Sequence, residues 1–393
     1  MWAGVAVSNV GDGLRLVAFP LLATTITRDP GLVAGLTVAL RVPWLLFSIP
    51  AGALIDRLDR KKLMAFASLA RATAVGVLTA VILIDEASLP ILYVVAFLVG
   101  TGEVLFDTTA QAIIPTTVDR EHLERANGRI FATELIGNEL VGPLVGSFLF
   151  ALAIGVPFLS SASAYLLASL FLIGMRGSYR AVRSAEADAV PRRTLDGLRY
   201  VLGDPLLRTL TIFGAVWNFV IGAVSGTLVL FALEILGLGN VGFGLLIAAE
   251  AVGGIVGTFL AARTSRRFGQ GRTILTAGSL QGVCFSVAGL LSNPWWTGLV
   301  LAVAQAATLI CVVVLVTLRQ VLVPDHFLGR ATAAMRVIAI GCMPLGAAFG
   351  GLLASRFGLR VPLLIAAPMM VMTALFSARV FNNRTVAARV GAL

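Results

Sequence analysis

The sequence predicts an all-α polytopic membrane protein whose twelve transmembrane helices form two pseudo-symmetric six-helix bundles. Three observations predict this fold: the composition, a set of twelve long apolar segments, and a repeat that relates the two halves. Of the 393 residues, 58% are hydrophobic and only 13% are charged, whereas soluble domains carry about 25% charged residues. A helix in water needs a polar face, so the solvent for most of this chain is expected to be lipid.

Twelve segments are long and apolar enough to cross a bilayer, which requires about 20 mostly apolar residues. The first six cover residues 3–26, 31–55, 62–84, 89–114, 127–152 and 156–175. The last six cover residues 206–234, 240–262, 272–291, 295–318, 331–354 and 360–381. Lipid cannot satisfy exposed backbone groups, and these segments are too long and unalternating for barrel strands. All twelve are therefore expected to be helices.

An internal repeat divides the chain into two halves. Leu123-Glu124-Arg125-Ala126 recurs as Leu328-Gly329-Arg330-Ala331 at an offset of 205, and the same offset relates Val156-Pro157 to Val361-Pro362. Two halves of six helices related in parallel are known among secondary transporters. We predict an N-terminal bundle of residues 1–175, a cytoplasmic central loop of 176–205, a C-terminal bundle of 206–382 and a cytoplasmic tail of 383–393. Leucines around Arg199 predict a short amphipathic helix on the inner membrane surface.

Basic residues are concentrated in every second connection between the segments, after the second, fourth, sixth, eighth and tenth. The positive-inside rule then places both termini in the cytoplasm. The net charge of +10 arises from these clusters, so no nucleic-acid partner is expected. Lys61 and Lys62 are the only lysines among the 30 basic residues, a bias that favours a GC-rich bacterial source. The predicted location is the bacterial cytoplasmic (inner) membrane.

The connection after the second segment carries the most specific local motif, Gly52-Ala-Leu-Ile-Asp56-Arg57-Leu-Asp59-Arg60-Lys61-Lys62. It resembles the loop 2–3 signature of the major facilitator superfamily, G-x-L-x-D-R-x-G-R-K. Asp59 replaces the usual glycine, and because Asp tolerates a left-handed turn, the turn is expected to survive. A degenerate copy of this motif lies in the second half, from Arg263 to Gly269.

The resemblance implies that this loop is a conformational latch whose charge contacts bias one of two rigid-body states. The latch residues are Gly52, Asp56, Arg57, Arg60 and Lys61, with Asp56 facing a neighbouring helix N-terminus. The alternative is that the basic residues only set topology.

The fifth segment carries Gly137-Asn-Glu139-Leu-Val-Gly142-Pro143-Leu-Val-Gly146. It resembles a fifth-helix motif of the same superfamily that is associated with exporters and antiporters. Gly142 and Gly146 permit close helix approach, and Gly142-Pro143 predicts a kink. Similar glycine pairs occur in the second half, where helix packing alone accounts for them.

The resemblance covers nearly the whole chain and is closest to the branch that includes the bacterial enterobactin exporter and macrolide-efflux-like proteins. The residues that carry it are Gly11-Asp12-Gly13, Arg41-Val-Pro43-Trp44, Phe106-Asp107 and Arg125-Ala126-Asn127-Gly128. It implies the major facilitator fold and a monomeric, cofactor-free exporter of a drug-like or siderophore-like molecule. This branch commonly has a basic tail before its first helix, and an upstream start is one interpretation of its absence here.

Ionisable residues at bilayer depth are costly and are therefore functional candidates. The candidates for proton coupling or substrate binding are Asp12, Arg41, Arg71, Glu103, Asp107 and Glu139. Five acids face three bases in the first half, and Asp12 can pair with Arg15 three residues along one helix. A buried carboxyl without a basic partner takes up a proton more readily. We hypothesise that protons move inward through these acids and drive export; the alternative is a purely structural network.

Other classes of function fit the sequence less well. It has no phosphate-binding G-x-x-x-x-G-K-[ST] loop for an ATP-driven pump. A membrane-embedded enzyme would need a nucleophile or metal ligands, but both histidines fall in expected loops and no catalytic or metal residue is predicted. A passive channel and an importer remain alternatives. Aromatic residues of the second half suit a bulky, partly apolar substrate; they are Phe213, Trp217, Phe219, Phe231 and Phe243.

Overall fold

The structure is a computed structural model that describes residues 1–118, 122–175, 177, 179 and 190–381. Its described residues are almost entirely helical, with no strand among them. The chain forms two compact units. Unit 1 comprises Met1–Val190 and Leu238–Ala248, and unit 2 comprises Pro191–Gly237 and Ala249–Leu393.

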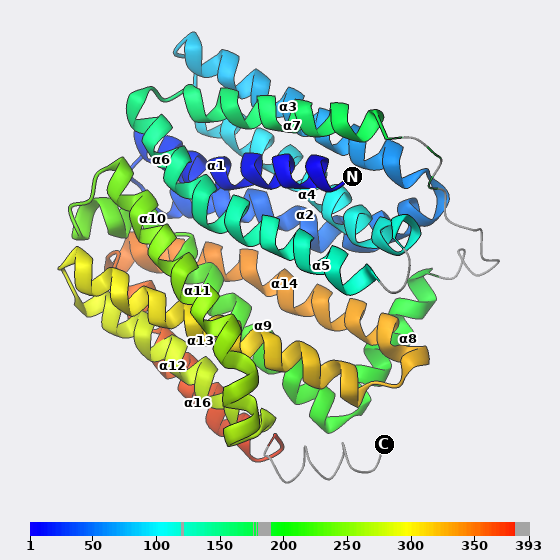
Figure 1. The fold of residues 1–393 in the computed structure, drawn as a ribbon. Helices are drawn as coiled ribbons and strands as arrows, with labels where there is room; N and C mark the ends of the chain where they lie inside the picture. The colour runs from blue at the N-terminus through cyan, green and yellow to red at the C-terminus, as the bar shows by residue number, and fades with distance from the viewer. Residues whose placement is uncertain (119–121, 176, 178, 180–189, 382–393) are drawn as a thin grey trace. The chain divides into compact units, whose positions relative to one another are not determined.

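Unit 1 is built mainly from the helices coloured blue to cyan-green in Figure 1. They are α1 (Trp2–Ile26), α2 (Pro30–Arg57), α3 (Arg60–Leu83), α4 (Leu89–Thr117), α5 (Leu123–Thr133), the π-helical segment η2 (Glu134–Val141), α6 (Gly142–Leu152) and α7 (Val156–Ile173). Helix α1 packs against α6 and α7, α2 packs against α4, and α3 packs against α4 and α7. Helix α1 is therefore central to the packing of this unit.

Unit 2 contains the remaining helices, apart from residues 240–248 at the start of α11, which belong to unit 1. They are α8 (Val190–Gly203), α9 (Pro205–Ser225), α10 (Leu228–Leu230), η4 (Phe231–Ile235), α11 (Asn240–Phe268), α12 (Gln270–Leu290), α13 (Pro294–Leu322), α14 (Asp325–Phe357), α15 (Val361–Leu364) and α16 (Ala366–Ala378). Helix α9 packs against α14, and α12 packs against α13 and α16. Helix α8 confirms that the segment around Arg199 is helical; its position on a membrane surface stays a prediction.

Local sequence explains where several helices begin. Asp29, Asp204 and Asn293 each precede a proline at the first helical position. Their side chains accept backbone N–H groups of the first turn, with donor–acceptor distances of 2.9 to 3.3 Å. A capping side chain satisfies N–H groups that lack an intrahelical partner, and proline at the next position has no N–H to lose.

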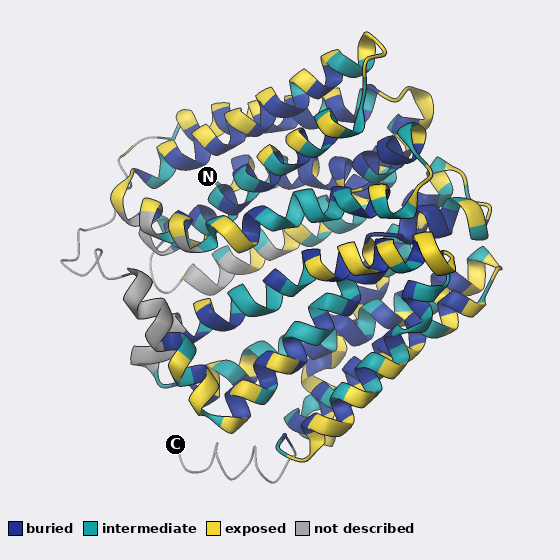
Figure 2. Ribbon diagram, turned by 180° about the vertical axis from the view of Figure 1, so that it is seen from behind, coloured by how far each residue is buried: buried dark blue, intermediate teal, exposed yellow. Residues whose placement is uncertain are grey.

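The helices confirm the expected membrane fold. Within the described residues, twelve helices are long and apolar enough to cross a membrane, and each overlaps one of the twelve predicted segments. Figure 2 shows that buried and exposed residues share the same helices. Many of the exposed side chains are large and apolar, such as Phe259 at 81% and Trp295 at 84% exposure. Such surfaces are suited to lipid rather than water.

Two details of the predicted segments were wrong. The seventh, expected as one helix over 206–234, ends at Ser225, and Gly226–Thr227 separates it from α10. The twelfth is interrupted at Ile365. In the fifth, the eight residues before Gly142 are π-helical, which was not predicted; the kink expected at Gly142-Pro143 stays a prediction. Apolar periodicity does not detect such breaks, since both sides of each remain apolar.

The repeat is visible in the helix boundaries. Helix α4 (89–117) and helix α13 (294–322) begin and end at an offset of 205, as do α7 and the α15–α16 pair. The predicted limits of the bundles and loop remain predictions, and the predicted tail of residues 383–393 lies outside the described residues.

Candidate functional site

Asp12 is the centre of a buried polar network in unit 1. Asp12 is only 4% exposed. Its carboxylate accepts a hydrogen bond of 2.7 Å from the hydroxyl of Tyr165 on α7. Arg15, one turn along α1, approaches Asp12 Oδ1 to 3.1 Å, as the sequence spacing predicts. Arg71 on α3 approaches both carboxylate oxygens, at 3.2 and 3.3 Å. One carboxylate thus connects three helices.

The glycines beside Asp12 explain how α1 comes close to its neighbours. A Cβ on Gly11 would lie 3.0 Å from the Tyr165 ring. A Cβ on Gly13 would overlap the carbonyl of Gly137 and lie 2.8 Å from Gly142 Cα. Absence of side chains on both sides lets the two backbones approach. The Gly11-Asp12-Gly13 motif therefore positions the carboxylate by allowing this contact.

Arg71 is completely buried. Its second terminal nitrogen donates to Ser8 Oγ at 2.8 Å. Its guanidinium carbon lies 4.6 Å from the ring centroid of Phe106 and 4.4 Å from that of Tyr165. A planar guanidinium can stack on aromatic rings and bind a carboxylate at the same time, which an ammonium cannot do equally well.

Glu103 on α4 extends the network to a fourth and a fifth helix. One carboxylate oxygen forms a close ion pair with Arg15, and the other lies 3.4 Å from Arg41 Nη1 on α2. The network thus joins two carboxylates to three arginines through α1, α2, α3, α4 and α7. Four of the six predicted residues, Asp12, Arg41, Arg71 and Glu103, are brought together here.

The other two predicted residues lie outside these contacts. Asp107 is four residues from Glu103 on α4, so it lies one turn further along the same face. Among the described residues no hydrogen bond or ion pair to Asp107 is present. Glu139 lies on the π-helical segment η2 and does not join the network. Two acids, Asp12 and Glu103, thus share all three arginines of the first half.

Sequence reasoning missed Tyr165 and Ser8, which are neutral and therefore were not sought as intramembrane charges. It also missed a neutral network in unit 2. The indole N–H of Trp217 on α9 donates to the Gln281 carbonyl on α12, and the Gln281 amide donates to Thr308 Oγ1 on α13 at 2.7 Å. Gln281 is completely buried.

The two networks occupy matching positions in the repeat. Gln281 and Arg71 are each twelve residues after the residue that caps their helix, Gly269 and Asp59 respectively. Thr308 matches Glu103 at the repeat offset of 205. The salt bridges of unit 1 therefore correspond to uncharged hydrogen bonds in unit 2. Phe213 and Phe231, expected near a substrate path, are buried in packing.

The loop between α2 and α3 binds the end of α7 and the nearby chain. Lys61 Nζ donates to the Met175 carbonyl at 2.7 Å, and Arg60 Nη1 donates to the Ala112 carbonyl of α4 at 2.9 Å. Asp59 accepts the backbone N–H groups of Lys62 and Tyr179 at 3.2 and 3.0 Å. These contacts fix the loop within unit 1.

The expected left-handed turn at Asp59 was wrong. Asp59 has φ −70° and acts as the N-cap of α3, whereas the matching Gly269 has φ +81°. A side-chain cap therefore replaces a turn that glycine would allow. Two other latch candidates remain. A Cβ added to Gly52 would have no neighbouring atom within 4 Å. The side chain of Asp56 lies outside the described part of the structure.

The fifth-helix glycines contact α1. A Cβ on Gly142 would lie 2.5 Å from Gly13 Cα, and a Cβ on Gly146 would lie 2.7 Å from the Leu14 carbonyl. Pro143 follows in the first turn of α6. Gly137 is less constrained, because its nearest neighbour would be 3.4 Å away. The predicted close-approach face of Gly142 and Gly146 is therefore present, and it faces the helix that carries Asp12.

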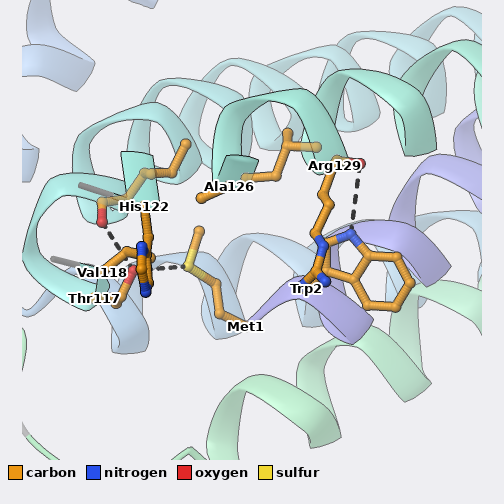
Figure 3. Close-up of a pocket in the computed structure, with 9 residues that line it drawn as sticks. Met1, Trp2, Thr117, Val118, His122, Ala126 and Arg129 are labelled. Atoms are coloured by element: carbon orange, nitrogen blue, oxygen red, sulfur yellow. Dashed lines mark hydrogen bonds between the residues drawn. The ribbon is translucent and has the colours of Figure 1, made fainter. Parts of the chain in front are cut away.

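A separate cavity of about 310 Å³ lies where the ends of α1, α4 and α5 meet (Figure 3). Its walls include Trp2, Thr117, His122 and Arg129, and the Trp2 indole N–H donates to the Arg129 carbonyl at 3.5 Å. None of the predicted site residues lines it. Within the part of the chain that the structure describes, no group of three or more metal-ligating side chains occurs; the expected absence of a cofactor stays a prediction.

Comparison with known proteins establishes the family. A family model described as transmembrane secretion effector, within the major facilitator superfamily, matches residues 1–389. The chain belongs to this family. This match confirms the predicted major facilitator superfamily. The protein is a multi-pass transporter of the bacterial membrane.

Proteins similar in sequence to this chain include efflux proteins. The multidrug efflux pump Tap of Mycolicibacterium fortuitum is 27% identical over 379 residues, which cover 93% of this chain and 91% of the relative. Macrolide efflux protein A of Streptococcus pyogenes is 24% identical over 387 residues, which cover 95% and 93% of the two chains.

Solved structures confirm the fold. A bacterial homologue of the iron transporter ferroportin, in its inward-facing state, has a TM-score of 0.75 at 16% identity and covers 96% of this chain and 97% of its own. A POT family transporter in complex with 5-aminolevulinic acid has a TM-score of 0.77 at 11% identity, with 97% and 96% covered.

Proposed function

We propose that this transporter exports a small, partly apolar molecule across the cytoplasmic membrane in exchange for protons, by alternating access. Export is supported by the efflux activity named for the relatives and by the Gly142-Pro143 motif. The observation that carries proton coupling is the salt-bridge network of Asp12, Arg71 and Glu103, which has only a neutral counterpart in unit 2.

Glu103 is the acid that best explains how a proton changes the structure. Its two oxygens bind different helices, one through Arg15 on α1 and the other through Arg41 on α2. Protonation neutralises the carboxylate and converts one oxygen to a hydroxyl donor, so both ion pairs weaken together. Loss of both contacts releases α4 from α1 and from α2 at this depth, so that protonation of one carboxylate is coupled to helix movement.

Asp107 is the second candidate proton site. It lies on the same face of α4 as Glu103 and makes none of the described ion pairs. A proton at Asp107 does not break a salt bridge, so this residue suits transfer of protons to and from Glu103. Asp12, which contacts Arg15, Arg71 and Tyr165, then acts as the fixed anchor for the arginines.

The test is drug transport in proteoliposomes under an imposed proton gradient. Asp12→Asn, Glu103→Gln and Asp107→Asn are compared with Glu86→Gln, a control in the exposed connection between α3 and α4. We expect Glu103→Gln to abolish gradient-driven transport and leave substrate binding measurable, and Glu86→Gln to behave as the wild type. If Asp12→Asn, Glu103→Gln and Asp107→Asn all retain full coupled transport, the proton mechanism is wrong.

The proposal has four further parts. Both termini lie in the cytoplasm, the chain acts as a monomer, it has no enzymatic activity, and the loop from Gly52 to Lys61 acts as a latch between states. The alternative function is import, which the same vesicles distinguish by the direction in which substrate accumulates. Chemical conversion of the substrate in that assay would instead indicate a membrane-embedded enzyme.

A further inference from the structure

A groove on unit 1 begins at the loop between α2 and α3 and continues between α3 and α4. It consists of two adjoining cavities of about 810 and 760 Å³ that share Phe66 and Leu105 in their walls. The first cavity contains Asp59, Lys61 and Lys62. The two parts differ sharply in chemistry, since one is charged and the other is apolar.

The second cavity accepts only hydrocarbon. No charged residue lines it. Its two hydroxyl groups are already used, because Thr73 donates to the Leu69 carbonyl at 3.0 Å and Thr101 donates to the Phe97 carbonyl at 2.8 Å. The hydroxyl donors are therefore occupied, and a polar group that accepts hydrogen bonds would lose its bonds to water without replacement here.

The length of the apolar part matches one leaflet of a bilayer. From Phe66 to Val77, both in its wall, α3 rises about 16 Å at 1.5 Å per residue. Half of a hydrocarbon core is about 15 Å. The side chains along this path are exposed and apolar, including Phe66, Val77 and Leu98. The groove is thus suited to an acyl chain that runs from the interface towards the bilayer centre.

The charged end provides one available cation. Lys61 Nζ donates to the carbonyls of Met175 and Ile173 at 2.7 and 3.4 Å, and the Asp59 carboxylate accepts two backbone N–H groups. Lys62 is exposed, and its ammonium has no hydrogen bond or ion pair within the described residues. Together, two lysines and one aspartate leave this end with one net positive charge, beside the N-terminus of a 24-residue helix, which also favours anions.

We propose that this groove is a binding site for an anionic glycerophospholipid, with its phosphate at Lys62 and one acyl chain between α3 and α4. This site is separate from the buried network, so lipid binding here does not depend on whether transport is coupled to protons. In the predicted topology the charged end faces the inner leaflet, where anionic lipids attract basic residues.

The test is native mass spectrometry of the full chain with phosphatidylglycerol or phosphatidylcholine of identical acyl chains. The wild type is expected to retain phosphatidylglycerol preferentially. Lys62→Ala keeps the backbone N–H that donates to Asp59, so the helix cap survives. This variant should reduce the preference for phosphatidylglycerol by about fivefold, the effect of one basic residue near an anionic surface. Lys62→Arg should restore it.

Two variants separate this site from general lipid contact. Arg272→Ala removes the cation at the matching position of α12, the third residue after Gly269, and should leave the preference unchanged. Ala70→Trp fills the apolar part and should reduce retention of both lipids. Equal loss in Lys62→Ala and Arg272→Ala, or an unchanged preference in Lys62→Ala, would overturn the proposal, as would equal retention of both lipids by the wild type.

Discussion

Arg71 shows how much one intramembrane side chain can connect. Its guanidinium binds Asp12 and Ser8 and stacks between Phe106 and Tyr165. Its aliphatic stem passes over Gly102, where a Cβ would lie 2.5 Å from Arg71 Cγ. Packing, charge and hydrogen bonding therefore all select arginine at this position.

Replacement of Arg71 should lower stability by an amount that depends on which of these interactions is lost. Arg71→Met leaves the buried carboxylate of Asp12 with one basic partner, and removing one member of a buried pair costs about 3–5 kcal/mol. Arg71→Lys keeps the charge and loses the stacking, so a smaller loss is expected. Thermal unfolding in detergent checks the order; equal stability of all three proteins would contradict it.

At this scale the sequence predicted charges better than their neutral partners. It identified Asp12, Arg71 and Glu103 because an ionisable residue at bilayer depth is costly, and helical spacing alone paired Asp12 with Arg15. It did not predict Tyr165, because a neutral phenol carries no such cost and its contact with Asp12 spans 153 positions of sequence. Such partners are determined by the packing of α1 on α7.

Helix backbones approach one another closely where at least one of them has a glycine, and this makes glycine substitutions informative. Gly142→Ala places a Cβ against Gly13 and the Gly137 carbonyl, and overpacking of this kind costs about 1–3 kcal/mol. Gly76→Ala, in α3 with nothing within 4 Å, should stabilise the protein slightly by restricting the unfolded chain. Chemical denaturation in detergent measures both, and a shift of the same sign for the two would refute the close contact.

Arg360 is an exception to the charge alternation that has a structural explanation. It binds the last carbonyls of α12, at 2.6 Å for Gly289 and 3.1 Å for Leu291, and the Ser292 hydroxyl at 2.6 Å. Cations stabilise helix C-termini.

Arg360→Ala should therefore destabilise the protein by about 1 kcal/mol, the usual value of such hydrogen bonds at a partly exposed site. Arg356→Ala, in the last turn of α14, is the control for loss of charge alone. Hydrogen exchange at the end of α12 distinguishes them, since only the first variant should increase it.

Helix type was less predictable than helix position. Apolar length located every span, but the irregularity predicted at Gly142-Pro143 does not coincide with the π-helical part of the fifth, Glu134–Val141. The π-helical form of η2 was not predicted, because the wider turn of a π-helix leaves the composition of the segment unchanged.

For the whole molecule, the repeat has kept its helix boundaries while its buried chemistry has diverged. Arg71 corresponds to Gln281, and Glu103 corresponds to Thr308. The sequence alone indicated this asymmetry as a surplus of buried charges in the first half, but it did not show that a matching neutral network exists, since Trp217, Gln281 and Thr308 are common packing residues.

This divergence predicts different effects from equivalent substitutions. Gln281→Leu removes a hydrogen-bond partner of Trp217 and Thr308, so it should alter stability or substrate preference and leave the pH dependence of transport unchanged. Glu103→Gln should remove that pH dependence. Transport assayed from about pH 6 to about pH 8, around the neutral range in which general acids and bases act, separates the two variants. A changed pH profile in Gln281→Leu would argue against this division.

The scarcity of lysine gives the loop between α2 and α3 an analytical use. Besides the terminal amine, Lys61 and Lys62 are the only amines that an amine-selective reagent can modify. The Lys61 ammonium is held by carbonyls at the end of α7 and just after it. A reagent that cannot cross lipid should therefore label chiefly Lys62, and only from the aqueous side on which this loop lies. Covalent modification of intact cells and of inverted vesicles would thus report the orientation of the protein without any fusion tag.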